Sequence, residues 1–369
     1  MRMSDVSIKQ LAQACGVAVS TASRAMNNRV GVSRVTREMI QAKAGEIGYV
    51  PNAYARSLKI LGEQTVAVII QGHTSELLIQ ILSDLQEQLS QAGFSAFLQH
   101  VPDHQANFDT IHRITQERKP GGIIFLGRFG DTEHTSSDEI NRKLSQLEIP
   151  VVHCTTADFS TPQSRHSSVS IDDVGGCAEV TRYLIDRGHT KIAFATVIGS
   201  NRLTDGHAWS LRHKGFVTAL EDANIEVDPD LVIPSLDPVE LYSMSNGYES
   251  VKGWLSSSDR DFTALVASCD AIALGAMRAL NEAGLRVPDD VAVTGFDGLD
   301  FAQYCMPSLT TVVQPQKQIA YATARAMIEA LTNSRHVARQ EWIRGEIRMG
   351  ESTGPDVKPA LANVGASSH

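Results

Sequence analysis

The sequence predicts an α/β protein in which a small helical head precedes a core of two doubly wound parallel sheets. Helical periodicity fills the first 50 residues, whereas from residue 65 hydrophobic strands alternate with amphipathic helices. Charge divides the chain at the same place. The first 61 residues carry nine Lys or Arg and three Asp or Glu, a net charge of +6, and the remainder carries −15. A basic head on an acidic body is typical of a module that contacts phosphates joined to one that does not.

The head begins with two helical runs joined by a tight turn. Apolar or small residues recur at helical spacing over 8–12 and again over 22–26. Gly16 lies between the runs, where the chain must turn sharply, and Ser20 and Thr21 can cap the second helix. This pattern predicts a helix-turn-helix whose second helix can enter a DNA major groove. A helical hairpin that packs only against its own core is the alternative.

A third helix is predicted after this pair, with Ser33 or Thr36 as its cap and Gly48 at its end. Its apolar positions are Val35, Met39, Ile40, Ala44 and Ile47. Residues 52–61 form a further helical segment that is too short to be stable alone in water. We expect this segment to need DNA or a partner copy to become ordered.

The strands predicted from residue 65 onward are hydrophobic throughout, as in parallel sheets covered on both faces. They are 65–71, 94–100, 121–127, 149–154, 190–196, 263–267 and 290–296. The helices predicted between them are 76–93, 105–117, 138–147, 173–187, 208–223, 242–257 and 270–283. This stretch is too long for one sheet, so two lobes are expected. Ligands of such sheets bind outside the carboxyl ends of the strands, which predicts a pocket between the lobes.

Several classes of protein are disfavoured by what the sequence lacks. The five cysteines are odd in number and contain no C-x-x-C pair, which indicates reduced thiols without a zinc site or disulfide framework. No apolar run is long enough to span a membrane, and the N-terminus lacks a signal-peptide pattern, so a cytoplasmic protein is expected. No phosphate-binding loop or nucleophile–base motif occurs, so we expect neither an enzyme nor a cofactor or metal.

Three motifs carry a resemblance to a known family. They are L-A-x-x-x-G-V-x-x-S-T-x-S-R-x-x-N from Leu11 to Asn27, V-S-x-x-T-R from Val32 to Arg37, and G-Y-x-P-N-x-x-A-R-S-L from Gly48 to Leu58. With them, residues 8–61 resemble the DNA-binding head and hinge of the lactose/galactose-repressor family of bacterial transcription factors. The resemblance continues through most of the chain. It implies a periplasmic-binding-protein architecture for the core, in which the chain crosses between the lobes three times.

The resemblance also implies a division into domains. The expected domains are a helix-turn-helix domain over 1–50, a hinge helix and linker over 51–62, a two-lobed effector-binding and dimerisation domain over 63–352, and a disordered tail over 353–369. The expected lobes are 63–162 with 314–341, and 163–312 with 342–352. Because a two-fold operator needs two heads, a homodimer is the minimum assembly. Apolar residues on 76–91, 105–117 and 270–283 can supply its interface.

The family implies roles for matching residues of the head. Val19 and Ser20 fall where the principal base-reading side chains lie, and Leu58 matches a hinge leucine that wedges between base pairs in the minor groove. Val19 can touch a thymine methyl group but cannot hydrogen-bond. The expected DNA-binding residues are Ser7, Val19, Ser20, Thr21, Ser23, Arg24, Asn27, Ser33, Thr36, Asn52, Ala55, Arg56 and Leu58.

The core carries two sharper family positions. Arg212 in W-S-L-R-x-x-G-F matches an arginine that grips ligand hydroxyls or a carboxylate, and Asp297 in V-T-G-F-D-G matches an aspartate that accepts from sugar hydroxyls. A structural Arg–Asp pair in the cleft wall is the alternative. With the strand ends, the expected effector-binding residues are Gln71, His73, Arg128, Arg212, Cys269, Asp270, Phe296 and Asp297.

The chain also departs from the family pattern. Cys269 replaces the usual asparagine and cannot form its paired hydrogen bonds. The helix start at 75–78 lacks the aromatic residue often found there, and Arg128 is an added cation that could favour an anionic ligand. The identity of the effector therefore stays open.

These observations together predict a transcriptional regulator, a repressor, that binds a pseudo-palindromic operator as a dimer. Its partners are double-stranded operator DNA and a small effector, a sugar or sugar derivative, without a membrane. Three alternatives remain: a purine-type corepressor-dependent regulator of the same family, a sugar-binding protein, and an α/β enzyme. The basic head disfavours the second alternative, and the lack of catalytic pairings disfavours the third.

Overall fold

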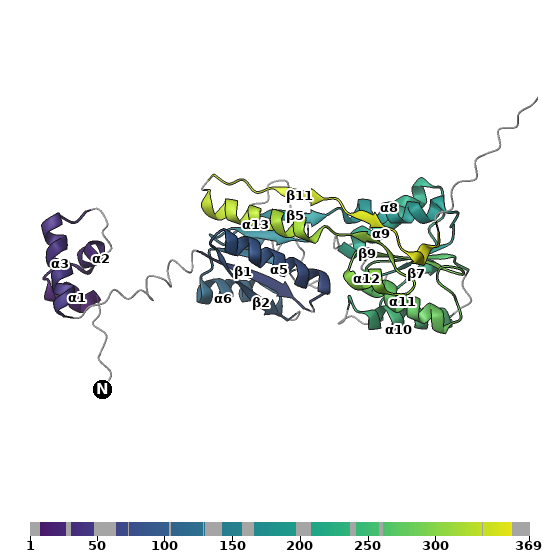
Figure 1. Cartoon of the computed structure of the whole chain (residues 1–369), viewed down its shortest axis with the longest axis horizontal. Coiled ribbons are helices and arrows are strands. Elements are labelled where there is room, and N and C mark those ends of the chain that lie inside the picture. Colours follow the sequence, from purple (N-terminus) through teal and green to yellow (C-terminus); the bar gives the residue numbers. More distant parts are fainter. Residues whose placement is uncertain are drawn as a thin grey trace, which may run out of the picture. The chain divides into compact units, whose positions relative to one another are not determined.

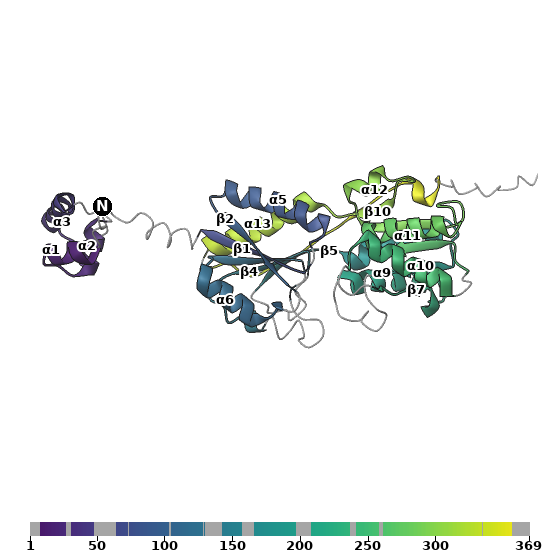
Figure 2. The same cartoon turned by 90° about the horizontal axis from the view of Figure 1, so that it is seen from below.

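The computed structural model consists of two compact units, Met1–Glu63 and Gln64–His369 (Figures 1 and 2). The structure describes residues 8–26, 31–47, 64–72, 74–102, 105–127, 129, 142–156, 166–196, 208–236, 241–257, 261–333 and 335–355. The expected hinge helix at 51–62 lies outside these residues.

The first unit contains three helices, α1 (Ile8–Ala14), α2 (Val19–Met26) and α3 (Arg34–Glu46). They pack around a small core of four buried residues, Leu11, Ala25, Ile40 and Ala44. Gly16 makes the predicted turn between α1 and α2 with φ +62°, a conformation that favours glycine. This arrangement confirms the predicted helix-turn-helix.

The helix starts in the first unit correct one expectation and decide between two others. Helix α2 begins at Val19, because the Ala18 carbonyl accepts from the amides of Thr21 and Ala22. Ser20 and Thr21 therefore lie in the first turn and do not cap it. Ser33 is the cap of α3, since its Oγ accepts from the Thr36 amide at 3.1 Å.

The apolar positions named for α3 do not share one face. Val35 is 77% exposed and Met39 is 47% exposed, whereas Ile40 and Ala44 are buried. At 100° per residue, Val35 and Met39 point well away from the face that Ile40 and Ala44 share.

The second unit contains two six-stranded sheets. The first has the order β2-β1-β3-β4-β5-β11 and is parallel throughout. Its strands are β1 (Thr65–Gln71), β2 (Ser95–Val101), β3 (Gly122–Leu126), β4 (Val151–Cys154), β5 (Ser167–Ile171) and β11 (Gln340–Ile343). Helices α5 (Glu76–Gln91) and α13 (Gln316–Thr332) cover one face and α6 (Phe108–Arg118) covers the other (Figure 2).

The second sheet has the order β7-β6-β8-β9-β10-β12, in which only β12 is antiparallel. Its strands are β6 (Ile192–Ala195), β7 (Val232–Ile233), β8 (Ala264–Ala267), β9 (Ala292–Asp297), β10 (Thr310–Val313) and β12 (Glu346–Arg348). Helices α8 (Asp173–Asp186) and α9 (Ala208–Asp222) cover one face, and α10 (Met244–Ser257) and α11 (Asp270–Glu282) cover the other. Short helices α12 (Asp300–Tyr304), η3 (Pro229–Leu231) and η4 (Glu351–Thr353) complete this lobe.

The lobe boundaries differ from the predicted ones. Strand β5 pairs with β4 and β11 in the first sheet, so Ser167–Ile171 does not belong to the second lobe as expected. Strand β11 likewise keeps the chain in the first sheet through Ile343, two residues beyond the expected crossing. Strand pairing decides both boundaries, because each strand hydrogen-bonds along its length to the first sheet before the chain leaves it. The tail also starts later than expected, since Thr353 is buried and bonded to Thr310.

The chain crosses between the lobes three times, from β5 to α8, from β10 to α13 and from β11 to β12 (Figure 1). Every crossing leaves a sheet at the carboxyl end of a parallel strand. The carboxyl edges of the two sheets are therefore the edges that the crossings join. This topology places the strand ends that can bind a ligand next to the crossings.

Candidate functional site

The exposed face of α2 is the candidate DNA-reading surface. Val19 is 43% exposed, and Ser20 and Arg24 are exposed, whereas Ala22 and Ala25 are fully buried against the head's core. Thr21 is half-buried, and Ser23 lies on the same helix. Val19, Ser20 and Arg24 thus project from a helix that its buried face holds in place.

The remaining residues expected to bind DNA divide into two groups. Ser33 and Thr36 lie at the start of α3, where their side-chain oxygens are 2.7 Å apart. The other six lie outside the described residues: Ser7, Asn27, Asn52, Ala55, Arg56 and Leu58.

A buried ionic network occupies the carboxyl edge of the second sheet. Arg212 on α9 donates from Nε to Asp173 Oδ1 at 2.8 Å and lies 3.3 Å from Asp297 Oδ1 through Nη1. Nη1 also donates to the Ser268 carbonyl at 2.6 Å, and the Phe296 ring lies 3.8 Å from the guanidinium carbon. We call Arg212, Asp173, Asp297, Phe296, Ser268 and Gln314 the Arg212 site.

Elements of the second lobe position each of these groups. Asp173 is the first residue of α8, directly after the crossing from β5, and Asp297 ends β9 with φ +119°. Gln314 follows β10 and donates from Nε2 to Asp297 Oδ1 at 2.7 Å. Parallel strands that end at one edge bring these side chains together although they are far apart in sequence.

Burial dominates the electrostatics of the Arg212 site. It raises the pKa of Asp173 to about 6, while the adjacent Arg212 opposes the rise. Burial also raises the pKa of Asp297, again against Arg212. Burial lowers the pKa of Arg212, but Asp173 and Asp297 more than reverse this effect and leave the pKa raised. The guanidinium is therefore a permanent charge, held by two carboxylates and a carbonyl.

Hydrogen-bonding capacity remains at the Arg212 site. Among the described residues, no partner reaches Arg212 Nη2 or Asp297 Oδ2. The buried Ser268 Oγ and Gln314 Oε1 also have none there. The Arg–Asp pair that the sequence left as an alternative is thus present, and the same residues still offer donors and acceptors to a ligand.

Two residues that were expected to contact the effector, Asp270 and Cys269, are buried at the start of α11. Asp270 is fully buried, and its two oxygens accept from the Leu299 amide at 2.7 Å and from Thr311 Oγ1 at 2.5 Å. Burial, and then the charge of Asp297, raise the pKa of Asp270 to about 7. Cys269 is 1% exposed at the start of α11 without a side-chain capping bond, and burial raises the pKa of its thiol.

The first lobe contributes only one described residue to the expected effector-binding set. Gln71 is half-buried at the end of β1, and His73 and Arg128 lie outside the described residues. Sequence reasoning missed Asp173, Ser268 and Gln314. The rule that ligand contacts follow strand ends would have found Asp173 and Gln314 if β5 and β10 had been recognised.

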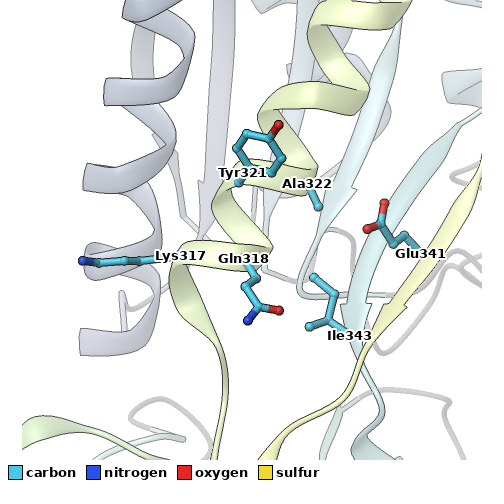
Figure 3. A pocket seen from close by; sticks show the side chains of 6 residues that line it. All are labelled: Lys317, Gln318, Tyr321, Ala322, Glu341 and Ile343. Carbon is cyan, nitrogen blue, oxygen red and sulfur yellow. The ribbon is translucent and has the colours of Figure 1, made fainter.

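A separate pocket of about 340 Å³ lies between α13 and β11 (Figure 3). Its lining residues are Lys317, Gln318, Tyr321, Ala322, Glu341 and Ile343. None of them belongs to the expected effector-binding set.

Other kinds of site find no support in the described part of the chain. No three of its His, Cys, Asp and Glu side chains are grouped so that they could hold a metal ion. None of its helices is long and apolar enough to cross a membrane.

Comparisons with known proteins agree with this architecture. Residues 7–52 match the model of bacterial regulatory proteins of the lacI family, and residues 181–353 match a periplasmic binding protein-like domain. The transcriptional regulator MalR of Clostridium butyricum is 30% identical over 331 residues, which cover 89% of this chain and 93% of MalR.

Solved structures show the same fold. The regulator CelR in complex with cellobiose is 26% identical, with a TM-score of 0.67 and coverage of 94% of this chain and 99% of CelR. The lac repressor dimer bound to operator and the anti-inducer ONPF is 21% identical, with a TM-score of 0.68 and coverage of 95% and 100%.

A helix-turn-helix unit joined to a two-lobed binding core defines a DNA-binding transcriptional regulator, and the relatives are regulators and not enzymes. The chain belongs to the lacI family of bacterial regulatory proteins.

Proposed function

We propose that this regulator is a cytoplasmic repressor that binds a pseudo-palindromic operator as a homodimer. A sugar or sugar derivative at the Arg212 site controls its affinity for the operator. Each head presents one α2, and a two-fold operator offers two major-groove half-sites, so two copies are needed.

The free hydrogen-bonding capacity of the Arg212 site carries the effector proposal. Arg212 Nη2 donates, Asp297 Oδ2 and Gln314 Oε1 accept, and Ser268 Oγ does either. A sugar hydroxyl both donates and accepts, so neighbouring hydroxyls match a site where donors and acceptors alternate. Burial makes the site selective for hydroxyl groups, because a ligand that lacks them leaves buried polar atoms unpaired. The complex of the similar regulator CelR with cellobiose supports the same class of ligand.

Charge favours a neutral effector over an anionic one. Two carboxylates already neutralise Arg212 at 2.8 and 3.3 Å, so an incoming carboxylate or phosphate would face Asp173 and Asp297. An anion would need a further cation, for which Arg128 is the candidate from the sequence.

The purine-type alternative has weaker support. A flat heteroaromatic ligand is best held by stacking on an aromatic ring. Helix α5 begins after its Ser75 cap with Glu76, Leu77 and Leu78, so it offers no ring at its start. A sugar-binding transport protein and an enzyme are excluded by family membership.

The DNA half of the proposal rests on α2 and on the family motif. Val19 would touch a thymine methyl group, Ser20 would hydrogen-bond a base edge, and Arg24 would contact a base or phosphate. Leu58 would wedge into the minor groove and kink the operator. The further contacts proposed are Ser7, Thr21, Ser23, Asn27, Ser33, Thr36, Asn52, Ala55 and Arg56.

An operator-binding titration tests the proposal. The dissociation constant of the full-length protein for operator DNA would be measured by fluorescence anisotropy with and without each compound of a panel. The panel contains neutral mono- and disaccharides, of which cellobiose is tested first. It also contains sugar acids, sugar phosphates, nucleosides and purine bases. We expect one neutral sugar to change the operator dissociation constant by about 5- to 150-fold, the usual range of allosteric coupling. A response to purines alone would contradict the sugar proposal, and no specific operator binding under any condition would contradict the repressor itself.

A further inference from the structure

Leu299 belongs to the second lobe by its backbone, but its side chain is buried in the first lobe. The residue is 3% exposed and packs in the core cluster formed by α5, α13 and the strands of the first sheet. Phe301, two residues later, packs against that cluster and also against the core of the second lobe. Side-chain packing therefore joins the lobes here, in addition to the three crossing segments.

The backbone around Leu299 is fixed to the second lobe from two sides. The Leu299 amide donates to Asp270 Oδ2 at 2.7 Å, and the Leu299 carbonyl accepts from Arg348 Nη2 at 3.0 Å. Asp270 is itself held by Thr311 on β10. The backbone can therefore shift only if α11, β10 or β12 shifts with it.

The same loop begins at the Arg212 site. Asp297 lies two residues before Leu299, and the Gly298 between them has φ +73°, where an added Cβ would lie 2.6 Å from Val313 Cα. Asp297 is also bonded to Gln314 through its side chain and its carbonyl. Gln314 is where the chain crosses from β10 toward α13 of the first lobe. Asp297 is thus linked to the first lobe along two short routes.

We propose that Leu299 is the positioning residue that couples effector binding at Asp297 to the relative orientation of the lobes. Cores are closely packed, so a buried side chain must move with its surroundings. When the lobes rotate, the first lobe must carry Leu299 with it, and the short loop must transmit that movement to Asp297. By reciprocity, a ligand that fixes Asp297 favours one orientation of the lobes. This inference rests on the proposed effector site.

The test compares Leu299→Ala with Leu280→Ala in the full-length protein. Leu280 is a matched control because it is equally buried but packs only in the second lobe's core, on α11. Binding of cellobiose, and of any other sugar that binds in the panel, is measured by calorimetry, and operator release by anisotropy at saturating sugar.

We expect Leu299→Ala to keep the sugar dissociation constant within about threefold of wild type. Saturating sugar should change the operator dissociation constant of this variant by less than about twofold. Leu280→Ala should release the operator as wild type does. Equal release by wild type and Leu299→Ala would overturn the coupling role. If no sugar binds the wild-type protein, the proposed effector class fails instead.

A second measurement needs no effector. Thermal unfolding of the core should show one transition in wild type and in Leu280→Ala but two in Leu299→Ala, because the lobes then unfold separately. A single transition in all three proteins would contradict the link. If Leu299→Ala does not fold, Leu299→Val, which removes one methylene, should show a partial loss of operator release, and full release would overturn the proposal.

Discussion

The exposed face of α2 and the Arg212 site place the residues proposed to be functional in opposite environments. On α2 the proposed reader Val19 is 43% exposed, and the helix is held in place by other residues, which are buried. In the core Arg212 is 4% exposed and Asp173 is 2% exposed, so the residues proposed to bind the effector also hold the lobe together. Truncating a proposed functional side chain to alanine should therefore cost little stability in the head and much stability in the core.

This difference follows from what each site must recognise. A DNA groove is large and wet, and its phosphates attract side chains that reach outward. A small ligand gains its free energy from a few polar groups that are fixed before it arrives. At the proposed effector site, the buried guanidinium of Arg212 is fixed between two carboxylates.

Arg212→Ala should give the largest effect. The substitution leaves Asp173 and Asp297 buried without their cation, which costs about 3–5 kcal/mol of unfolding free energy. Operator release by the effector should disappear. Urea unfolding would measure the stability, with Arg286→Ala as control, since Arg286 is exposed and pairs with Asp289 and Asp290. The control should leave the midpoint of urea unfolding nearly unchanged, because ion pairs of exposed side chains contribute little to stability. Equal effects of the two substitutions would contradict the importance of burial.

Glycine-to-alanine substitutions should have the next largest effects, with opposite signs on the stability of the core and of the head. A Cβ on Gly275 would lie 2.1 Å from the Met244 carbonyl oxygen, so Gly275→Ala should destabilise the core by about 1–3 kcal/mol. Gly45 on α3 has nothing within 4 Å of that position. Gly45→Ala should stabilise the head by about 0.5–1 kcal/mol through helix propensity. Hydrogen exchange resolved along the full-length chain measures both, and loss of protection in the head of Gly45→Ala would refute the second expectation.

The stability of the core should also depend on pH through Asp270. Its folded-state pKa of about 7 lies above the ordinary value of 3.8, so the folded protein binds more protons between these values. The free energy of unfolding should fall as pH rises from about 4 to 7, by up to about 1.4 kcal/mol per pH unit.

Asp270→Asn should flatten this dependence. Its amide can still accept from the Leu299 amide and can donate to Thr311, so the fold should be kept. Urea unfolding over this pH range in both proteins is the measurement, and identical slopes would rule out Asp270 as the source.

Arg24→Ala should have the smallest effect on stability and a selective effect on binding. Because Arg24 is exposed, the unfolding free energy should change by less than about 0.5 kcal/mol. Operator affinity should fall by about 1–3 kcal/mol if Arg24 reads a base, with relaxed sequence preference. If Arg24 contacts only phosphate, the affinity for all DNA sequences should fall alike. The slope of the logarithm of the binding constant against the logarithm of the salt concentration should then become shallower by about one. Unchanged operator affinity would remove Arg24 from the interface.

Much of this architecture could be predicted because its signals are local. Strands β1, β3 and β8 are continuous hydrophobic runs, and the Gly16 turn and the Ser33 cap depend on single residue types. Strand β5 could not be recognised in the same way. Its sequence SSVSI contains three serines, yet every residue is buried, because the strand lies between β4 and β11.

The Arg212 site could be predicted only in part. Arg212 and Asp297 were found by resemblance, whereas Asp173 and Gln314 depend on where β5 and β10 end. Asp270, which was expected to contact the effector, has internal partners that the sequence did not indicate. Its oxygens accept hydrogen bonds from Leu299 and Thr311, residues 29 and 41 positions later in the chain. Long-range pairings of this kind leave no periodic signal in the sequence.

Thermal unfolding of wild type and Asp297→Asn against the sugar panel tests the central claim most directly. Asparagine tolerates the positive φ of Asp297 and can still accept from Gln314, so the fold should be kept while the carboxylate is lost. A sugar at 100 times its dissociation constant stabilises wild type by about 2.7 kcal/mol. We predict that one neutral sugar raises the melting temperature of wild type and not that of Asp297→Asn. An equal rise in both proteins would contradict an effector site at Arg212 and Asp297.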